Sequence, residues 1–347
     1  MTCCCRWRLV WALLVFHFCL VMVSPVSAQR SPDFWDIDFS CADSIALAYQ
    51  DQPLKDLKRA DVLALSLTRN LPTEVEKFRA IFYWITQNID YDMKMAKDHT
   101  AREARLARDQ KKLNIYRRTF HHRMERVLLE NKRGICAGYA MLLSSMSQAA
   151  GINCKTVTGM GRTMDTPIGE RRDNHAWNAV QLGNRWYLCD ATWASGYYDE
   201  YLKKFRRVYN DNYFLTEPSL FVANHYPADT TWMLLLQKPS WDEFVDAPIR
   251  SKGYIKSRVN TYLPQQGNLR VKKCGDVIFR FTSNSDRAPS AYIMVRGMTK
   301  TEHFDHKLVK DSEGRYFLNH TFEEKGKFLV DIVLNDQYAF RYEVYVK

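Results

Sequence analysis

Apolar residues recur every three or four positions in the N-terminal half of the chain, a pattern that predicts amphipathic helices. Short helices are expected over residues 42–50 and 60–70. A stronger helix, running to about residue 88, opens with Thr73 and Glu76 at the spacing of a capping box. Its buried face would consist of Val75, Phe78, Phe82, Ile85 and Ile89.

A further helix is predicted from about Cys136 to Gly151, which would form its C-terminal cap. Beyond it the apolar pattern alternates with a period of two, which indicates strands. One strand is expected over residues 154–159. The clearest β element is a hairpin of residues 175–182 and 185–192, because Gly183-Asn184 between them is typical of a tight turn.

From about residue 255 onward, short alternating runs separated by turn residues dominate the chain. This pattern predicts a small C-terminal β-sandwich of the immunoglobulin-like kind, with a boundary near residues 250–254. The expected strands are 269–273, 277–281, 291–296, 316–322, 328–334 and 338–346.

The predicted hairpin brings a histidine and an aspartate together. With a two-residue turn Leu182 faces Arg185, and this register places His175 and Asp190 on the same face as diagonal neighbours. Such neighbours lie about 7–8 Å apart at the backbone, within reach of long side chains. A carboxylate beside an imidazole fixes its tautomer and stabilises its charged form. The register therefore predicts a His–Asp pair.

Cys136 is the third candidate for chemistry. It would lie in the first turn of a helix, where the partial positive charge favours a thiolate, as do the neighbouring Lys132 and Arg133. The N–H groups of that turn could stabilise an oxyanion. Taken singly, a cysteine at a helix start is usually a small buried residue, and a lone histidine is usually structural. Zinc is a further alternative, but no CxxC or HxxxH pair accompanies these residues.

Three stretches in combination resemble the motifs of the transglutaminase-like superfamily: RGICAGYA at 133–140, NHAWN at 174–178 and WYLCDATW at 186–193. The resemblance is closest to its kyphoscoliosis peptidase branch. This branch is also matched by IFYWITQNIDYD at 81–92, YFLTEP at 213–218 and HYP at 225–227, so the resemblance covers about residues 75–240.

The resemblance implies an α+β fold with a transglutaminase-like (papain-like) core and an antiparallel sheet. It implies that Cys136 is the nucleophile, His175 the general base and acid, and Asp190 the orienting carboxylate. Tyr139, Trp177 and Trp193 match motif positions and are expected to shape the site. The chain is thus divided into a signal peptide (1–28), an N-terminal helical segment (29–72), a transglutaminase-like domain (73–250) and a β-sandwich (251–347).

The first 28 residues have the features of a secretory signal. Arg6 and Arg8 precede an apolar stretch from Leu9 to Val23. A short segment of mostly small residues, typical of a cleavage site, then ends at Ala28. We expect cleavage before Gln29 and a secreted or periplasmic protein without a stable membrane anchor. An uncleaved N-terminal tether is the alternative.

Export would also change the cysteine count. Four of the nine cysteines belong to the signal, which leaves Cys41, Cys136, Cys154, Cys189 and Cys274. Five is an odd number, so at least one would be free or pair between chains. Four could form two disulfides in three connectivities, and a bridge between Cys154 and Cys189 is conceivable.

The formal net charge of +11 first suggests a nucleic-acid partner, but the charge is confined to one segment. Residues 93–133 hold thirteen Lys and Arg against five acids, a net +8, while the signal carries two more positive charges. An exported protein that is otherwise nearly neutral is not expected to bind nucleic acid. The basic segment would either border the cleft and attract an anionic or cell-envelope substrate, or be a solvated helical excursion.

The sequence therefore predicts an exported enzyme with a Cys-His-Asp triad that acts on protein or peptide amides through a thioester. Peptidase-like hydrolysis is the first expectation. Glutamine cross-linking and a catalytically silent binding or scaffold module are the alternatives. No metal or organic cofactor is expected, and the sequence has no evident calcium loop.

Overall fold

The computed structural model describes residues 31–347 apart from 35, 286, 298–300 and 305–307. The predictions for residues 1–28, including the signal and its four cysteines, lie outside the described residues. Among the described residues, no helix is long and apolar enough to cross a membrane.

The helices of the N-terminal half form one layer of the core. Helices α1 (Ser40–Ala48) and α2 (Leu57–Thr68) pack against α3 (Glu74–Asn88), and α6 (Cys136–Ala149) lies against both α2 and α3. The capping box of α3 is present, because Thr73 accepts from the Glu76 N–H and Glu76 accepts from the Thr73 N–H. The predicted apolar face of α3 is buried.

An antiparallel sheet covers α6. Its strands are ordered β5-β4-β3-β8, with β3 at Cys154–Gly161, β4 at His175–Leu182, β5 at Arg185–Cys189 and β8 at His225–Pro227. Leu182 pairs with Arg185 and Asn178 with Cys189, which is the register predicted from the Gly-Asn turn.

The predicted strand 185–192 is too long. The strand β5 ends at Cys189, because the Asp190 side chain accepts hydrogen bonds from the N–H groups of Thr192 and Trp193 and so caps the short helix α7 (Ala191–Ser195). Asp190 therefore lies at a strand-to-helix junction.

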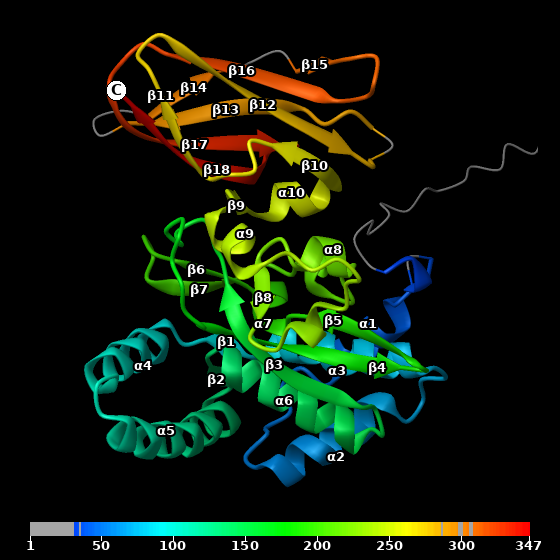
Figure 1. Cartoon of the computed structure of the whole chain (residues 1–347). Coiled ribbons are helices and arrows are strands. Elements are labelled where there is room, and N and C mark those ends of the chain that lie inside the picture. The colour runs from blue at the N-terminus through cyan, green and yellow to red at the C-terminus, as the bar shows by residue number, and fades with distance from the viewer. Residues whose placement is uncertain (1–30, 35, 286, 298–300, 305–307) are drawn as a thin grey trace, which may run out of the picture.

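The basic segment forms a helical hairpin, α4 (Met93–Leu106) and α5 (Gln110–Asn131). The two ends of the hairpin lie side by side, because β1 (Asp90–Tyr91) before α4 pairs in parallel with β2 (Arg133–Gly134) after α5. Figure 1 shows the hairpin, in cyan, standing to one side of the sheet. A small cluster of Met95, Phe120, Met124 and Ile135 anchors its base.

The C-terminal region consists of two sheets. One has the order β10-β12-β16-β15, and the other β11-β18-β17-β13-β14. Their apolar faces pack together, as the rings of Phe279 and Tyr342, 4.9 Å apart, illustrate. The strands are β10 (Val259–Leu263), β11 (Asn268–Val271), β12 (Gly275–Ser283), β13 (Ala291–Arg296), β14 (Thr301–Phe304), β15 (Val309–Lys310), β16 (Tyr316–Phe322), β17 (Gly326–Leu334) and β18 (Gln337–Val346). All six strands predicted there are present, and the immunoglobulin-like assignment stays a prediction.

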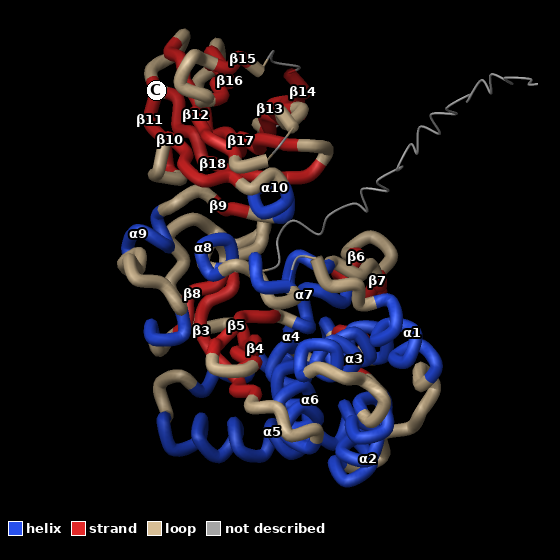
Figure 2. The backbone as a smooth tube through the Cα atoms, turned by 90° about the vertical axis from the view of Figure 1, so that its right-hand side faces the viewer, coloured by secondary structure: helices blue, strands red, loops and turns tan. Residues whose placement is uncertain are grey.

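The two halves share one apolar core, although Figures 1 and 2 place the C-terminal sheets at the end opposite α2 and α5. The strand β9 (Ile249–Arg250) pairs with β18. The remaining short elements are η1 (Pro32–Phe34), β6 (Gly196–Asp199), β7 (Lys204–Arg207), η2 (Asp211–Tyr213), α8 (Pro218–Phe221), η3 (Thr230–Met233), α9 (Trp241–Asp246) and α10 (Lys252–Lys256).

The five cysteines of the described residues are all free thiols. The conceivable Cys154–Cys189 bridge is therefore not formed. Both residues are buried in the core, where burial raises the pKa of each thiol, that of Cys154 to about 12. These two cysteines are structural core residues.

Candidate active site

Cys136 is the first residue of α6, and only 9% of it is exposed. The extended Ile135 caps the helix, and the β1–β2 ladder fixes the chain just before it. The first N–H groups of a helix have no partner within the helix and point beyond its end. Cys136 therefore lies at the positively polarised end of α6.

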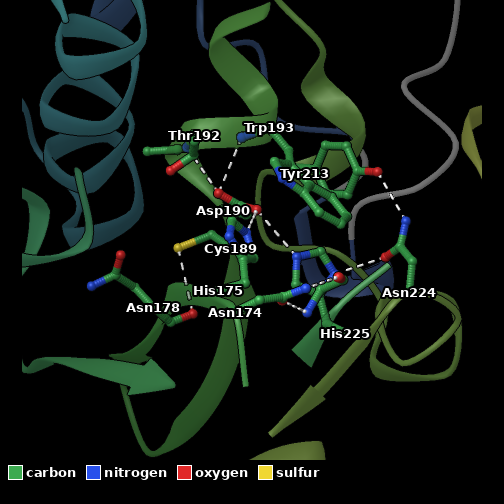
Figure 3. A network of polar contacts seen from close by, with 12 residues as sticks. Asn174, His175, Asn178, Cys189, Asp190, Thr192, Trp193, Tyr213, Asn224 and His225 are labelled. Atoms are coloured by element: carbon green, nitrogen blue, oxygen red, sulfur yellow. Dashed lines mark hydrogen bonds and ion pairs between the residues drawn. The ribbon is translucent and has the colours of Figure 1, made fainter. Parts of the chain in front are cut away.

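His175 and Asp190 meet as the hairpin register predicted. The His175 Nε2 lies 2.7 Å from the Asp190 Oδ2, and the aspartate is fully buried. The other carboxylate oxygen accepts from the N–H groups of Thr192 at 2.8 Å and Trp193 at 3.1 Å. Figure 3 shows the carboxylate between these donors. The cap that ends β5 thus also aims Asp190 at His175.

The electrostatics couple the three predicted residues. Burial opposes protonation of His175, but the charge and hydrogen bond of Asp190, together with the nearby Cys136, raise its pKa to about 10. Burial would raise the pKa of Asp190, yet the charge of His175 and hydrogen bonds from His175 and His225 hold it well below its usual range. The arrangement favours an imidazolium between a carboxylate and the Cys136 sulfur.

A second histidine lies behind the pair. His225 is fully buried on β8, and its Nε2 is 3.1 Å from the same Asp190 oxygen. Its Nδ1 is 2.7 Å from Asn224 Oδ1, and the Asn224 amide also bonds the Tyr213 hydroxyl at 3.1 Å. The motif HYP marked this position in the sequence, but no role followed from it because β8 is distant along the chain.

A backbone anchor holds the loop before His175. The Asn174 side chain accepts from the Gly161 N–H at 2.8 Å and donates to the Gly161 carbonyl at 3.1 Å. A Cβ on Gly161 would lie 2.9 Å from the His175 Cβ and Cδ2. The imidazole therefore packs directly on the β3 backbone, which requires glycine at this position.

Cys136 and His175 line a pocket of about 520 Å³, and the α4–α5 hairpin forms its other wall. The hairpin residues that line it are Ala96, His99, Thr100, Glu103, Ala104, Ala107, Leu113 and Arg117. Tyr91 also lines the pocket, and burial and the nearby Cys136 raise its pKa, so its phenol stays protonated. The basic segment thus borders this pocket, while the attraction of an anionic substrate stays a prediction.

The three residues predicted to shape the site occupy different places. Trp193 stacks on His175, with ring centroids 4.7 Å apart. Trp177 is buried beside His225, and its indole nitrogen has no hydrogen-bond partner among the described residues. Tyr139 lies in the core and donates its hydroxyl to the Ile89 carbonyl at 2.6 Å. Trp193 thus contacts His175 directly, whereas Tyr139 packs in the core beneath α6.

Two groups of side chains have the composition of metal ligands. The ligand atoms of His175, Asp190 and His225 lie within 4.8 Å of one another. Hydrogen bonds to one carboxylate oxygen already account for the orientation of both imidazoles. The other group, His121, His122 and Glu125, lies on the largely exposed face of α5.

Part of the chain is similar to known proteins. The model of the transglutaminase-like superfamily matches residues 61–191, which include Cys136, His175 and Asp190. The kyphoscoliosis peptidase of Homo sapiens is 31% identical over 236 residues, 65% of this chain and 33% of the relative. That of Mus musculus is 32% identical over 246 residues, 70% of this chain and 33% of the relative.

A more distant relative is hillarin of Drosophila melanogaster, 25% identical over 229 residues, 61% of this chain and 25% of that protein. Among solved structures, the Lin-41 filamin domain overlaps 24% of this chain and 89% of its own length. The sequence identity is 5% and the TM-score 0.20, too low to indicate a shared fold. The chain spans about a third of the length of the kyphoscoliosis peptidases. It carries a transglutaminase-like domain, and the kyphoscoliosis peptidases of human and mouse are its homologues over about two thirds of its length.

Proposed function

We propose that this protein is a cysteine-dependent enzyme that acts on protein or peptide amides through a thioester. The observation that carries the proposal is the placement of His175 between the Asp190 carboxylate and the Cys136 sulfur at the wall of a pocket. A thiolate paired with an imidazolium is an activated nucleophile.

The reaction follows from the proton on His175. The Cys136 thiolate attacks the amide carbonyl carbon, and first-turn N–H groups of α6 stabilise the resulting oxyanion. The tetrahedral intermediate expels the amine, which takes the proton from His175, and a thioester remains. Neutral His175 then removes a proton from water as the water attacks the thioester. The thiolate leaves, so that one amide and one water give an acid and an amine.

Peptidase-like hydrolysis is the favoured outcome, because the homologues over two thirds of the chain are named peptidases. Cross-linking differs in the second step, in which a substrate amine attacks the thioester instead of water. Incorporation of a labelled amine into a glutamine-containing protein would favour cross-linking. Release of cleaved peptides without amine incorporation would favour hydrolysis.

Alkylation of Cys136 by iodoacetamide tests the enzyme against a silent scaffold. An activated thiolate should react well below about pH 8.5, where an ordinary cysteine loses its reactivity. His175→Ala should abolish this low-pH reactivity. A folded protein whose Cys136 reacts like a free cysteine, or not at all, would contradict the proposal.

The substrate is proposed to be anionic near the bond that reacts. Arg117 of α5 and Arg172 of the loop before β4 both line the pocket with Cys136. Each pairs with a neighbouring acid, Glu103 or Glu170, at 2.6 Å. A substrate carboxylate could take the place of either acid, since both arginines are about half-exposed and solvent weakens such pairs.

A binding measurement tests this charge preference without chemistry. In a Cys136→Ala background, acidic peptides should bind more tightly than their amide counterparts. The Arg117→Gln, Arg172→Gln variant should reduce the difference. The matched control is Arg118→Gln, Arg171→Gln, because neither residue lines this pocket and Arg171 pairs with Asp242. Equal loss in both variants would leave only a general charge effect and refute the site.

Export and a C-terminal immunoglobulin-like module complete the proposal. Export rests on the sequence of residues 1–28. The module rests on the two packed sheets, and it would hold a protein partner or substrate. N-terminal sequencing of the protein recovered from the culture medium or periplasm, beginning at Gln29, would support export, whereas a retained Met1 would exclude cleavage.

A further inference from the structure

We propose that His225 is a positioning residue of this site: a neutral imidazole that donates its Nε2–H to Asp190 and thereby fixes the carboxylate that orients His175. The role for Asp190 rests on the proposed function, whereas the protonation of His225 does not. The sequence motifs give His225 no catalytic or positioning role.

The surroundings of His225 leave it no contact with water. It is fully buried, stacks on Phe221 at 4.0 Å and lies against Trp193 at 4.4 Å and Trp177 at 5.0 Å. The titratable groups that face it are Asp190, His175 and Tyr213. Among these groups only Asp190 carries a negative charge, and His175 already forms an ion pair with it.

These surroundings determine how many protons His225 carries. A second buried cation beside protonated His175 would share one carboxylate with it. Burial lowers the pKa of His225 to about 4, although the hydrogen bond and charge of Asp190 act in the opposite direction. His225 is therefore neutral near pH 7 and carries a single N–H.

The position of that N–H follows from its partners. The backbone of Phe221 also faces the ring and favours its protonation. The Asp190 carboxylate can only accept and is the charged, stronger acceptor, so the nitrogen 3.1 Å from it carries the proton. The Nδ1 then has a lone pair and needs a donor from Asn224. The Asn224 amide must accordingly present its NH2 to His225 and its carbonyl to the Tyr213 hydroxyl, which becomes the donor. The result is a directed chain from Tyr213 through Asn224 and His225 to Asp190.

This chain completes the set of donors around Asp190. One oxygen accepts from two backbone N–H groups and the other from two imidazoles. Four donors hold the carboxylate ionised and fixed in direction, because hydrogen bonds to the charged form favour it. Loss of His225 should loosen the oxygen that His175 contacts, and so weaken the imidazolium beside Cys136.

Two variants of similar size separate donation from packing. His225→Gln keeps an N–H donor, whereas His225→Leu does not. At neutral pH we expect His225→Leu to slow iodoacetamide alkylation of Cys136 about tenfold, the rate equivalent of losing one hydrogen bond to a charged group. His225→Gln should recover most of the rate. Equal rates in folded His225→Leu and wild type, or equal losses in both folded variants, would overturn the positioning role.

A measurement on the wild-type protein decides the proton position even if a variant fails to fold. The protein is labelled with 15N-histidine, and long-range 1H–15N spectra report which ring nitrogens carry protons. The His225 signals are those that disappear in His225→Gln, or otherwise those of the ring that shows nuclear Overhauser contacts with the Phe221 ring, on which His225 stacks. A neutral ring protonated at Nε2 is expected. Protonation at Nδ1, or at both nitrogens at pH 7, would overturn the proposal.

The two experiments also separate this inference from the proposed function. If Cys136 in the wild type alkylates like a free cysteine, the enzyme proposal fails. The Nε2–H state of His225 would still be observed, because the geometry around Asp190 does not depend on catalysis.

Discussion

Two buried histidines on one carboxylate titrate in opposite directions. The pKa of His175 is raised to about 10 and that of His225 is lowered to about 4, from a common reference of 6.5. Protonation of His175 therefore contributes stability that is fully present below pH 6.5 and is lost as the pH rises toward 10. For His225 the unfolded chain binds the proton first, so stability falls as the pH drops from 6.5 toward 4.

Unfolding by urea as a function of pH should separate these two contributions. His175→Gln is expected to flatten the loss of unfolding free energy between pH 6.5 and 10. His225→Gln should flatten the loss between pH 6.5 and 4. A His175→Gln profile parallel to that of the wild type above pH 6.5 would show that the ring is not protonated in the folded protein.

Gly161 sets the position of His175 by leaving room for it. Because a Cβ would lie 2.9 Å from the His175 ring, Gly161→Ala should displace the imidazole and destabilise the protein by about 1–3 kcal/mol. Alkylation of Cys136 at neutral pH should slow as well. The control is Gly138→Ala, whose Cβ would have an ordinary contact of 3.6 Å with Leu128. If Gly161→Ala unfolds and alkylates like the control, His175 does not depend on this contact.

At the scale of elements, the α4–α5 hairpin can be removed without touching Cys136, His175 or Asp190. His99 stacks on Phe120 at 3.9 Å, so the two helices approach each other near residues 97 and 119. Replacing residues 97–119 by a short Gly-Ser linker would remove the outer pocket wall and retain the base cluster of Met95, Phe120, Met124 and Ile135.

This deletion removes Arg117 but keeps Arg172, so it should reduce the preference for acidic peptides while Cys136 remains reactive toward iodoacetamide. The reason is that His175 and Asp190 lie on the sheet and do not depend on the hairpin. Peptide binding in the Cys136→Ala background and alkylation of the unmutated cysteine are the two measurements. Unchanged peptide preference would remove the hairpin from substrate recognition, and circular dichroism would verify the fold.

At the scale of the whole molecule, a buried arginine of the C-terminal sheets bonds to the transglutaminase-like part. Arg341 of β18 pairs with the fully buried Asp331 at 2.6 Å and donates to the Met164 carbonyl. Within the transglutaminase-like part, Arg162 donates to the carbonyls of Phe244 and Ala247 and so holds the segment that leads into β9. Together with the β9–β18 pairing, these contacts couple the two halves.

Breaking one of these contacts should destabilise both halves together. Arg341→Gln would leave Asp331 with Arg296, 2.7 Å away, as its remaining cation, so the cost should stay below that of a fully uncompensated buried charge, about 3–5 kcal/mol. Thermal unfolding should show a single transition at a lower midpoint. Arg315→Gln, at an exposed pair with Asp311, is the control and should leave the midpoint unchanged. Two separated transitions in Arg341→Gln would instead mean that the halves unfold independently.

The sequence by itself determined the local elements and much of the site. Periodicity and the Thr73–Glu76 box located α3, and the Gly183-Asn184 turn fixed a register that brings His175 to Asp190. These signals are readable because they depend on residues close together in the chain. The predicted length of the strand from residue 185 was wrong for a local reason as well, because Asp190 caps α7 instead of continuing β5.

Only the tertiary structure decided which distant segments complete the site. It placed His225 behind Asp190 and turned the basic hairpin toward Cys136, because contacts between β3 and β8 and between α4 and α5 leave no periodic trace in the sequence. It also left Cys154 and Cys189 as buried thiols, which their number alone could not reveal. Pairwise packing over long separations in the chain sets these features, whereas spacing along the chain sets the elements that carry them.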